Sequence, residues 1–194
     1  MWINRSLTAG LQTVHMNFTN IFCIVHKWEV WCAVSSRGII GPYCYENEEG
    51  HIVTVNAEWY IVMLETLLPI EFHPLQQDFL CFQQEGATAH TAQISMQVLK
   101  TLFWGRHISC FGDITWPACS PELAVPDYFL WGYLKSKVYK TCPANIDDLK
   151  QWILECIQGI PKEMLQRVTK AFPSWLQDCI EWHGCHLPSV IFKQ

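Results

Sequence analysis

Two acidic residues lie at boundaries of expected secondary-structure elements, one at the end of a strand and the other at the start of a helix. Glu85 follows the short apolar segment at Phe82 and precedes Gly86, as a residue at a strand end does. Asp127 follows Pro126 at the start of an amphipathic helix. A fold can bring a strand end and a helix start together, and paired carboxylates are what divalent cations require. Glu85 and Asp127 are therefore candidate metal ligands.

Both residues also have simpler interpretations. Glu85 could be an ordinary turn residue, and Asp127 favours the dipole of its helix whether or not a metal binds. His90 follows Glu85 closely and could contact DNA or a water molecule. A histidine at the start of a helix is nevertheless expected to be exposed to solvent.

The patterns around these residues predict a mixed order of strands and helices. Asn56 and Asn145 are expected to cap helices, and Pro69 is expected to end the first of them. The turn at residues 35–38 predicts a hairpin. The predicted strands span residues 28–35, 38–46, 79–83 and 107–111, and the predicted helices span 57–68, 89–103, 126–138, 146–158 and 162–182.

Six segments of the chain read FQQEGATAH, SPELAVPDYFLW, VWCAVSSRGIIGPY, VTVNAE, YLKSKVY and HGCHLPSVIF. Together they resemble the catalytic domain of mariner-type DNA transposases, in the wide-spaced branch of that superfamily. The family has a strand ending FQQDGA, a loop SPDL and the string PxDYFLW opening a helix. Here 41 residues separate Glu85 from Asp127, and the resemblance runs in one register from about Trp28 to Gln194.

The resemblance implies a ribonuclease-H-like α/β core, similar to that of retroviral integrases, with a mixed sheet flanked by helices. It also implies metal-dependent DNA cleavage and strand transfer, in which three acidic residues hold Mg²⁺ or Mn²⁺. The first two acids would lie on strands and the third on a helix. Carried over by position, Glu85 is the second acid and Asp127 is the third.

The first acid should lie on a strand upstream of Val30. The chain has no Asp before Asp78, and Glu29 begins the strand after the one required. We therefore expect the first acid and its strand to be missing, residues 1–27 to be an unmatched segment, and residues 28–194 to be a catalytic-like domain truncated at its N-terminal side. Glu85 replaces the family's Asp, and its extra methylene shifts the carboxylate by about 1.5 Å, which Mg²⁺ tolerates poorly.

The amino-acid composition indicates which classes of protein this chain can belong to. A chain of 194 residues with 50% hydrophobic and 16% charged residues is typical of one globular domain. A net charge of −5 is unusual for a DNA-handling protein, so we expect DNA binding to be weak and non-specific. The most apolar stretch, at residues 21–34, is interrupted by charge, which argues against a membrane span. The ten cysteines include no CxxC pair, and the group from Cys179 to His186 fits no common zinc pattern.

The ten tryptophans and ten cysteines accompany only four arginines. A single C-to-T change converts arginine codons into cysteine or tryptophan codons, so this balance indicates a decayed copy. Trp59 stands where the family has arginine, and Trp152 and Trp175 look like further cases. All three lie off the apolar stripes of their helices. We therefore predict that these three are substantially exposed, whereas Trp31 and Trp131 are buried.

The function predicted from these observations is that of a mariner-like transposase remnant without catalytic activity, and the resemblance to the family implies a location in the nucleus. The alternative is a host-recruited module that binds nucleic acid or protein without catalysis. A third interpretation is an unrelated tryptophan-rich scaffold. The family forms dimers, but the oligomeric state of this chain stays open.

Overall fold

The computed structural model describes residues 12–23, 26–71, 80–116, 123–141 and 143–181. The strands are β1 (Gln12–Cys23), β2 (His26–Val34), β3 (Ile39–Cys44), β4 (Leu80–Gln84), β5 (His107–Ser109) and β6 (Ile114–Thr115). The helices are α1 (Ala57–Glu71), α2 (Thr88–Thr91), α3 (Gln93–Leu102), the π-helical turn η4 (Pro126–Leu130), α4 (Trp131–Thr141), α5 (Ile146–Gln158) and α6 (Lys162–Glu181).

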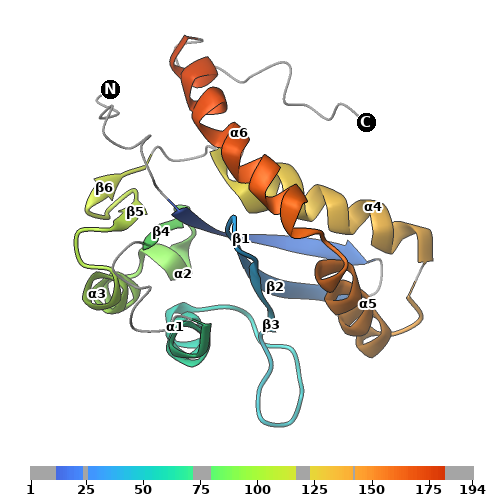
Figure 1. Ribbon diagram of the computed structural model, residues 1–194. Coiled ribbons are helices and arrows are strands. Elements are labelled where there is room, and N and C mark those ends of the chain that lie inside the picture. Colours follow the sequence, from blue (N-terminus) through green and yellow to red (C-terminus); the bar gives the residue numbers. More distant parts are fainter. Residues whose placement is uncertain (1–11, 24–25, 72–79, 117–122, 142, 182–194) are drawn as a thin grey trace.

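The described strands form one mixed sheet in the order β3-β2-β1-β4-β5-β6. Strand β2 is antiparallel to both of its neighbours, β1 and β3, whereas β1, β4, β5 and β6 run parallel. Strand β1 therefore lies at the centre, where the antiparallel half of the sheet meets the parallel half (Figure 1).

Strand β1 corrects one expectation from the sequence, which was that the first strand is missing. Gln12–Cys23 pairs with β2 over nine residue pairs, from His15↔Val34 to Cys23↔His26, and with β4 from Gln12↔Leu80 to Met16↔Gln84. The strand lies within residues 1–27, for which no family motif was found. Apolar and polar residues are mixed along this segment without a clear period of two, so the sequence did not predict the strand or its pairing with β2 and β4.

Helices cover both faces of the sheet, and each face has its own hydrophobic core (Figure 1). Helices α1 and α3 cover one face, which we call the α1 face. Helices α4, α5 and α6 cover the other, which we call the α4 face. Alternation along β2 divides its side chains between the two, because successive residues of a strand point to opposite faces. Trp31 and Ala33 are buried on the α1 face, and Val30, Cys32 and Val34 are buried on the α4 face.

Local sequence signals place several elements as predicted. The side chain of Asn56 accepts a hydrogen bond from the Trp59 backbone N–H at 2.9 Å, and that of Asn145 accepts one from Asp148 N–H at 2.8 Å. In the hairpin turn, the Ser35 hydroxyl donates to the Gly38 carbonyl at 3.0 Å. These caps and this turn confirm the predicted starts of α1 and α5 and the predicted β2–β3 hairpin.

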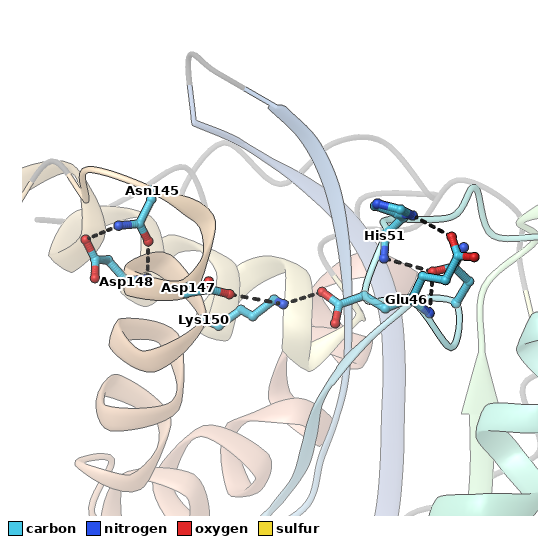
Figure 2. A network of polar contacts seen from close by, with 8 residues as sticks. Glu46, His51, Asn145, Asp147, Asp148 and Lys150 are labelled. Carbon is cyan, nitrogen blue, oxygen red and sulfur yellow. Dashed lines mark hydrogen bonds and ion pairs between the residues drawn. The ribbon is translucent and has the colours of Figure 1, made fainter.

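An ion pair links the end of β3 to α5. Lys150 pairs with Glu46, and its ammonium lies 3.5 Å from the carboxylate of Asp147 (Figure 2). The side chains of Lys150 and Glu46 are 27% and 23% exposed, so solvent still screens the pair in part. Its contribution to stability is therefore at the modest level of surface pairs, about 0–1 kcal/mol.

Other boundaries differ from the predictions. Helix α1 continues through Pro69 to Glu71, so this proline does not end it. The single helix predicted for 89–103 is divided, because Ala92 adopts an extended conformation with φ −56° and ψ 141° between α2 and α3. Strand β6 was not predicted, since two residues carry no recognisable period. None of the described helices is both long enough and apolar enough to span a bilayer.

The tryptophan prediction is confirmed in one part and wrong in the other. Trp31 is fully buried and Trp131 is 2% exposed, as expected. Trp59 and Trp152 are only half-buried and pack against the cores of the α1 face and the α4 face respectively. Trp175 is also half-buried, because α6 crosses over η4. Flank positions of a helix become contact positions when a neighbouring element covers them, which is why the helical stripes did not predict the burial of these three tryptophans.

Candidate active site

Glu85 immediately follows the last residue of β4, at the carboxyl end of the parallel half of the sheet. The next residue, Gly86, lies close to the thiol of Cys110 in the loop after β5, since a Cβ added to Gly86 would be 4.0 Å from that sulfur. The loops after two parallel strands thus meet at one edge of the sheet. In parallel sheets, ligands commonly bind at this edge.

A buried polar network on the α1 face fixes the end of β4. The Tyr60 hydroxyl donates to Gln84 Oε1 at 2.7 Å, and Gln84 Nε2 donates to the His90 carbonyl at 3.1 Å and contacts Met96 Sδ at 3.4 Å. Gln84 is 1% exposed and Tyr60 is fully buried. One glutamine therefore joins β4 to α1, α2 and α3 directly before Glu85.

His90 belongs to the same network, which corrects the expectation that it is exposed. Its side chain is fully buried, and its ring lies 4.4 Å from the ring of Tyr60. Burial lowers the pKa of His90 to about 3, although a hydrogen bond with the Glu85 backbone favours the protonated form. Burial, and secondarily the charge of Glu85, raises the pKa of Tyr60. Both rings are thus neutral at pH 7 and support the backbone that carries Glu85.

Asp127 lies in the first turn of η4, which continues directly into α4. Its backbone N–H donates to the Ala124 carbonyl at 2.9 Å. Pro126 and Leu130 are buried on either side of it, whereas Asp127 is half-buried. The neighbouring Tyr128 is held by α6, because its ring contacts Trp175 edge-on at 4.1 Å. Helix α6 therefore restrains the turn that carries Asp127.

The sheet brings the elements of both candidate acids to strand β1. Glu85 ends β4, which is paired with β1, and Asp127 lies in η4, which contacts β1 and β2. This arrangement places the two acids on neighbouring elements that are far apart in the sequence. A separation of about 4–8 Å between the two carboxylates, the range that shared metals can bridge, stays a prediction.

The resemblance implies a first acid on a strand upstream of Val30. Strand β1 precedes Val30 and lies beside β4, and it contains no Asp or Glu. Its pairing with β4 reaches Met16↔Gln84, so the next residue along each strand is Asn17 and Glu85. Among the residues that the structure describes, no three His, Cys, Asp or Glu side chains are grouped to hold a metal ion. A carboxamide residue thus stands level with Glu85 where a carboxylate was expected.

Gln83 is a residue of this region that the sequence did not single out. It is 3% exposed, and its Oε1 atom has no hydrogen-bond partner among the described residues. A signal was present, because Gln83 and Gln84 are adjacent polar residues on a buried strand and must point to opposite faces. Without the sheet neighbours, that signal could not show which of the two would lack a partner.

Two lysines that follow Asp127 on α4 differ in the exposure of their side chains. Lys137 is exposed and its ammonium lies over the Tyr133 ring at 5.6 Å, whereas Lys135 is half-buried. The side chain of Lys140, the residues of the SPELAV loop up to Glu122, and the histidines at 183 and 186 lie outside the described part of the chain.

The fold of this chain is similar to that of several solved structures. The sequence matches no protein-family model and no curated protein. The catalytic domain of Mos1 mariner transposase has a TM-score of 0.73 at 21% identity, over 94% of this chain and 86% of that one. The same domain with raltegravir and Mn has a TM-score of 0.71 at 20% identity, over 92% and 84%.

A pre-cleavage Mos1 transpososome is similar over 94% of this chain, with a TM-score of 0.71 at 18% identity. This chain covers 58% of that transposase chain, so it spans little more than half of the longer protein. The chain therefore has the mixed α/β fold of the mariner transposase catalytic domain, as the sequence resemblance predicted.

Proposed function

We propose that this chain is a ribonuclease-H-like catalytic domain of a mariner-type transposase that has lost DNA cleavage and strand transfer. The observation that carries the proposal is strand β1, which lies beside β4 in the sheet but supplies no acidic residue. The fold supports the family assignment, and one similar structure is the Mos1 transposase paired-end complex with the left transposon end. Loss of one acid from the set of three supports the loss of catalysis.

The oxygen atoms that remain at the site are of the type that binds a divalent cation, but there are fewer carboxylates than the three that the family uses. Glu85 and Asp127 offer carboxylate oxygens, and the buried Oε1 of Gln83 is an oxygen without a hydrogen-bond partner among the described residues. Oxygen ligands suit Mg²⁺ and Mn²⁺, and Mos1 catalytic domains have been solved with each of these metals. When bound in pairs, such metals activate the attacking oxygen and stabilise the leaving oxygen.

In this chain the protein groups perform only part of that task. The network of Tyr60, Gln84 and His90 holds the strand end that carries Glu85, and α6 holds the turn that carries Asp127. Two carboxylates carry a charge of −2, which balances one divalent cation rather than two. The site can therefore orient a cation without completing the two-metal arrangement.

We expect the wild-type chain to produce no nicks in supercoiled plasmid DNA with Mg²⁺ or Mn²⁺. The reason is the absent acid in β1, together with the longer side chain of Glu85. Conversion of supercoiled to open-circular DNA on agarose gels measures the activity. A metal-dependent nick that disappears in the variant Asp127→Ala would overturn the proposal, whereas a nick that persists in this variant would indicate a contaminating nuclease.

The variant Asn17→Asp tests whether position 17 is the site of the missing ligand. A carboxylate placed level with Glu85 adds one negative charge at the shared site, and we expect Mn²⁺ affinity to rise about tenfold, equivalent to about 1.4 kcal/mol. Electron paramagnetic resonance of free Mn²⁺ measures the affinity. Asn20→Asp is the matched control, because Asn20 lies on the same strand but pairs with Glu29 of β2. Equal effects in both variants would show general charge attraction instead.

A further inference from the structure

Helix α6 carries opposite charges in its two halves. Residues 162–170 contain three basic residues and one acidic residue, whereas residues 171–181 contain two acidic residues and no basic one. The basic pair Arg167 and Lys170 is exposed, and so is the acid Glu181, while the acid Asp178 is half-buried. The surface of this helix is therefore positive near its start and negative near its end.

The four charged residues lie on one stripe of α6 with Ser174 at its centre. Positions 167, 170, 174, 178 and 181 follow steps of three, four, four and three residues. At 100° per residue they fall within about 80° of arc, which is one side of the helix. Ser174 is small and exposed, so the backbone of α6 is accessible to a neighbouring helix at the middle of the stripe.

The opposite side of α6 holds the helix against the α4 face. Leu165 is buried in the core of that face, and the ring of Trp175 contacts the ring of Tyr128 at 4.1 Å. The Tyr128 hydroxyl also donates to the Val168 carbonyl at 3.4 Å. These contacts fix the rotation of the helix, so the charged stripe is directed away from the rest of the chain.

Contacts within the described part of the chain do not explain this order of charges. The dipole of a helix favours basic groups in the last turn, but α6 has no basic residue there and carries Asp178 and Glu181 instead. Arg167, Lys170 and Asp178 form no ion pair with another described residue. The arrangement is unfavourable for the isolated helix and becomes favourable beside a helix with the reverse order of charges.

We propose that α6 is a self-association surface, on which the α6 helices of two copies of this chain pair antiparallel about a two-fold axis at Ser174. Lys170 and Asp178 are each four residues from Ser174, and Arg167 and Glu181 are each seven residues from it. In this register Lys170 faces Asp178 of the second copy, and Arg167 faces Glu181 of the second copy. The two-fold axis repeats both pairs, and a surface that is self-complementary in this way forms a closed dimer.

The dimer is expected to be weak. Helix α6 has 20 residues and is about 30 Å long. A single pair of such helices forms an interface at the low end of the size range, for which a dimer Kd of roughly 10–100 µM is reasonable. The inference does not use the candidate acids Glu85 and Asp127, so it goes beyond the proposed function and is independent of it.

The test is sedimentation equilibrium of the full chain over about 5–500 µM, which brackets the expected Kd. We expect the wild type to change from monomer to dimer over this range. Lys170→Glu places an acid against Asp178 twice in the dimer, and Asp178→Lys places a base against Lys170 twice, so each variant should raise the Kd about tenfold. Lys100→Glu is the matched control, because Lys100 is exposed on α3 and its replacement changes the net charge equally.

An equimolar mixture of Lys170→Glu and Asp178→Lys separates this interface from a general effect of charge. In the mixed dimer the new acid of one copy faces the new lysine of the other, and the unchanged Asp178 faces the unchanged Lys170. The mixture should therefore regain the Kd of the wild type. Circular dichroism checks the folding of each variant, and Arg167→Glu with Glu181→Arg forms a second pair of the same design if either variant does not fold.

Three outcomes would each overturn the inference: a wild type that stays monomeric over the whole range, single variants that dimerise as tightly as the wild type, or a mixture that associates no more tightly than its separate components. An effect of Lys100→Glu equal to that of Lys170→Glu would also overturn it, since net charge alone would then control association. The proposed loss of catalysis is judged separately by plasmid nicking.

Discussion

Acidification from pH 7 to pH 4.5 is expected to destabilise the folded chain by roughly 2–3 kcal/mol for each of two buried histidines. Burial lowers the pKa of His90 to about 3 and that of His107 to about 4, while the charge of Asp113 partly opposes the shift at His107. An unfolded histidine titrates near 6.5. The unfolded chain therefore binds protons below pH 6.5 that the folded chain does not accept.

The sign follows from this difference in proton uptake. Stability is fully present above pH 6.5, falls as the pH drops below that value, and levels off only when the pH approaches the folded pKa of each histidine. The slope is about 1.4 kcal/mol per pH unit for one such histidine. Urea unfolding followed by circular dichroism at several pH values measures the free energy of unfolding.

Carboxylates also titrate in acid. Single variants therefore separate the contribution of each histidine to the pH dependence of stability from that of the carboxylates. His107→Gln should remove about half of the slope between pH 6.5 and 4.5, and His90→Asn should remove the other half. His51→Gln is the control, because the side chain of His51 is 74% exposed. Equal slopes in all four proteins would show that neither buried histidine controls the acid response.

The second large effect is expected from Gln84→Leu, which should lower the free energy of unfolding by roughly 2–4 kcal/mol. The variant removes the acceptor of the buried Tyr60 hydroxyl and the donor to the His90 carbonyl, and each buried group that loses its partner costs about 1–3 kcal/mol. Urea unfolding at pH 7 measures the change. Gln97→Leu on the exposed side of α3 should stay within about 0.5 kcal/mol of the wild type.

A double-mutant cycle with Tyr60→Phe shows whether the two side chains act as a pair. Their hydrogen bond is 2.7 Å long and both side chains are buried. Once Gln84 is leucine, loss of the Tyr60 hydroxyl removes a group that no longer has this acceptor. The double variant should therefore be more stable than the sum of the single variants implies, with a coupling of about 0.5–3 kcal/mol. Strictly additive costs would contradict the proposed role of the pair.

Local structure was largely determined by the sequence. Asn56 and Asn145 cap their helices as predicted, because a short polar side chain bonds to backbone N–H groups only two or three residues away. The β2–β3 hairpin has the same local origin, since its turn is stabilised by the bond from Ser35 to Gly38. The positions of Glu85 at a strand end and Asp127 at a helix start could be predicted for this reason.

Burial and sheet position were decided by the tertiary structure. His90 was expected to be exposed but is enclosed between Tyr60 and the end of β4, and Trp175 became half-buried because α6 covers Tyr128. In both cases the covering group is far away in the sequence, so a helical stripe could not reveal it.

The sequence by itself determined the starts of α1 and α5, the β2–β3 hairpin and the placement of the two candidate acids at element boundaries, and it identified the resemblance to a transposase family. Only the tertiary structure decided that β1 is the central strand, that Asn17 stands level with Glu85, and that Gln83 is buried without a hydrogen-bond donor among the described residues. The physical reason is that caps and turns depend on bonds between near neighbours in the chain. Strand order, face and burial depend instead on pairing between segments separated by dozens of residues.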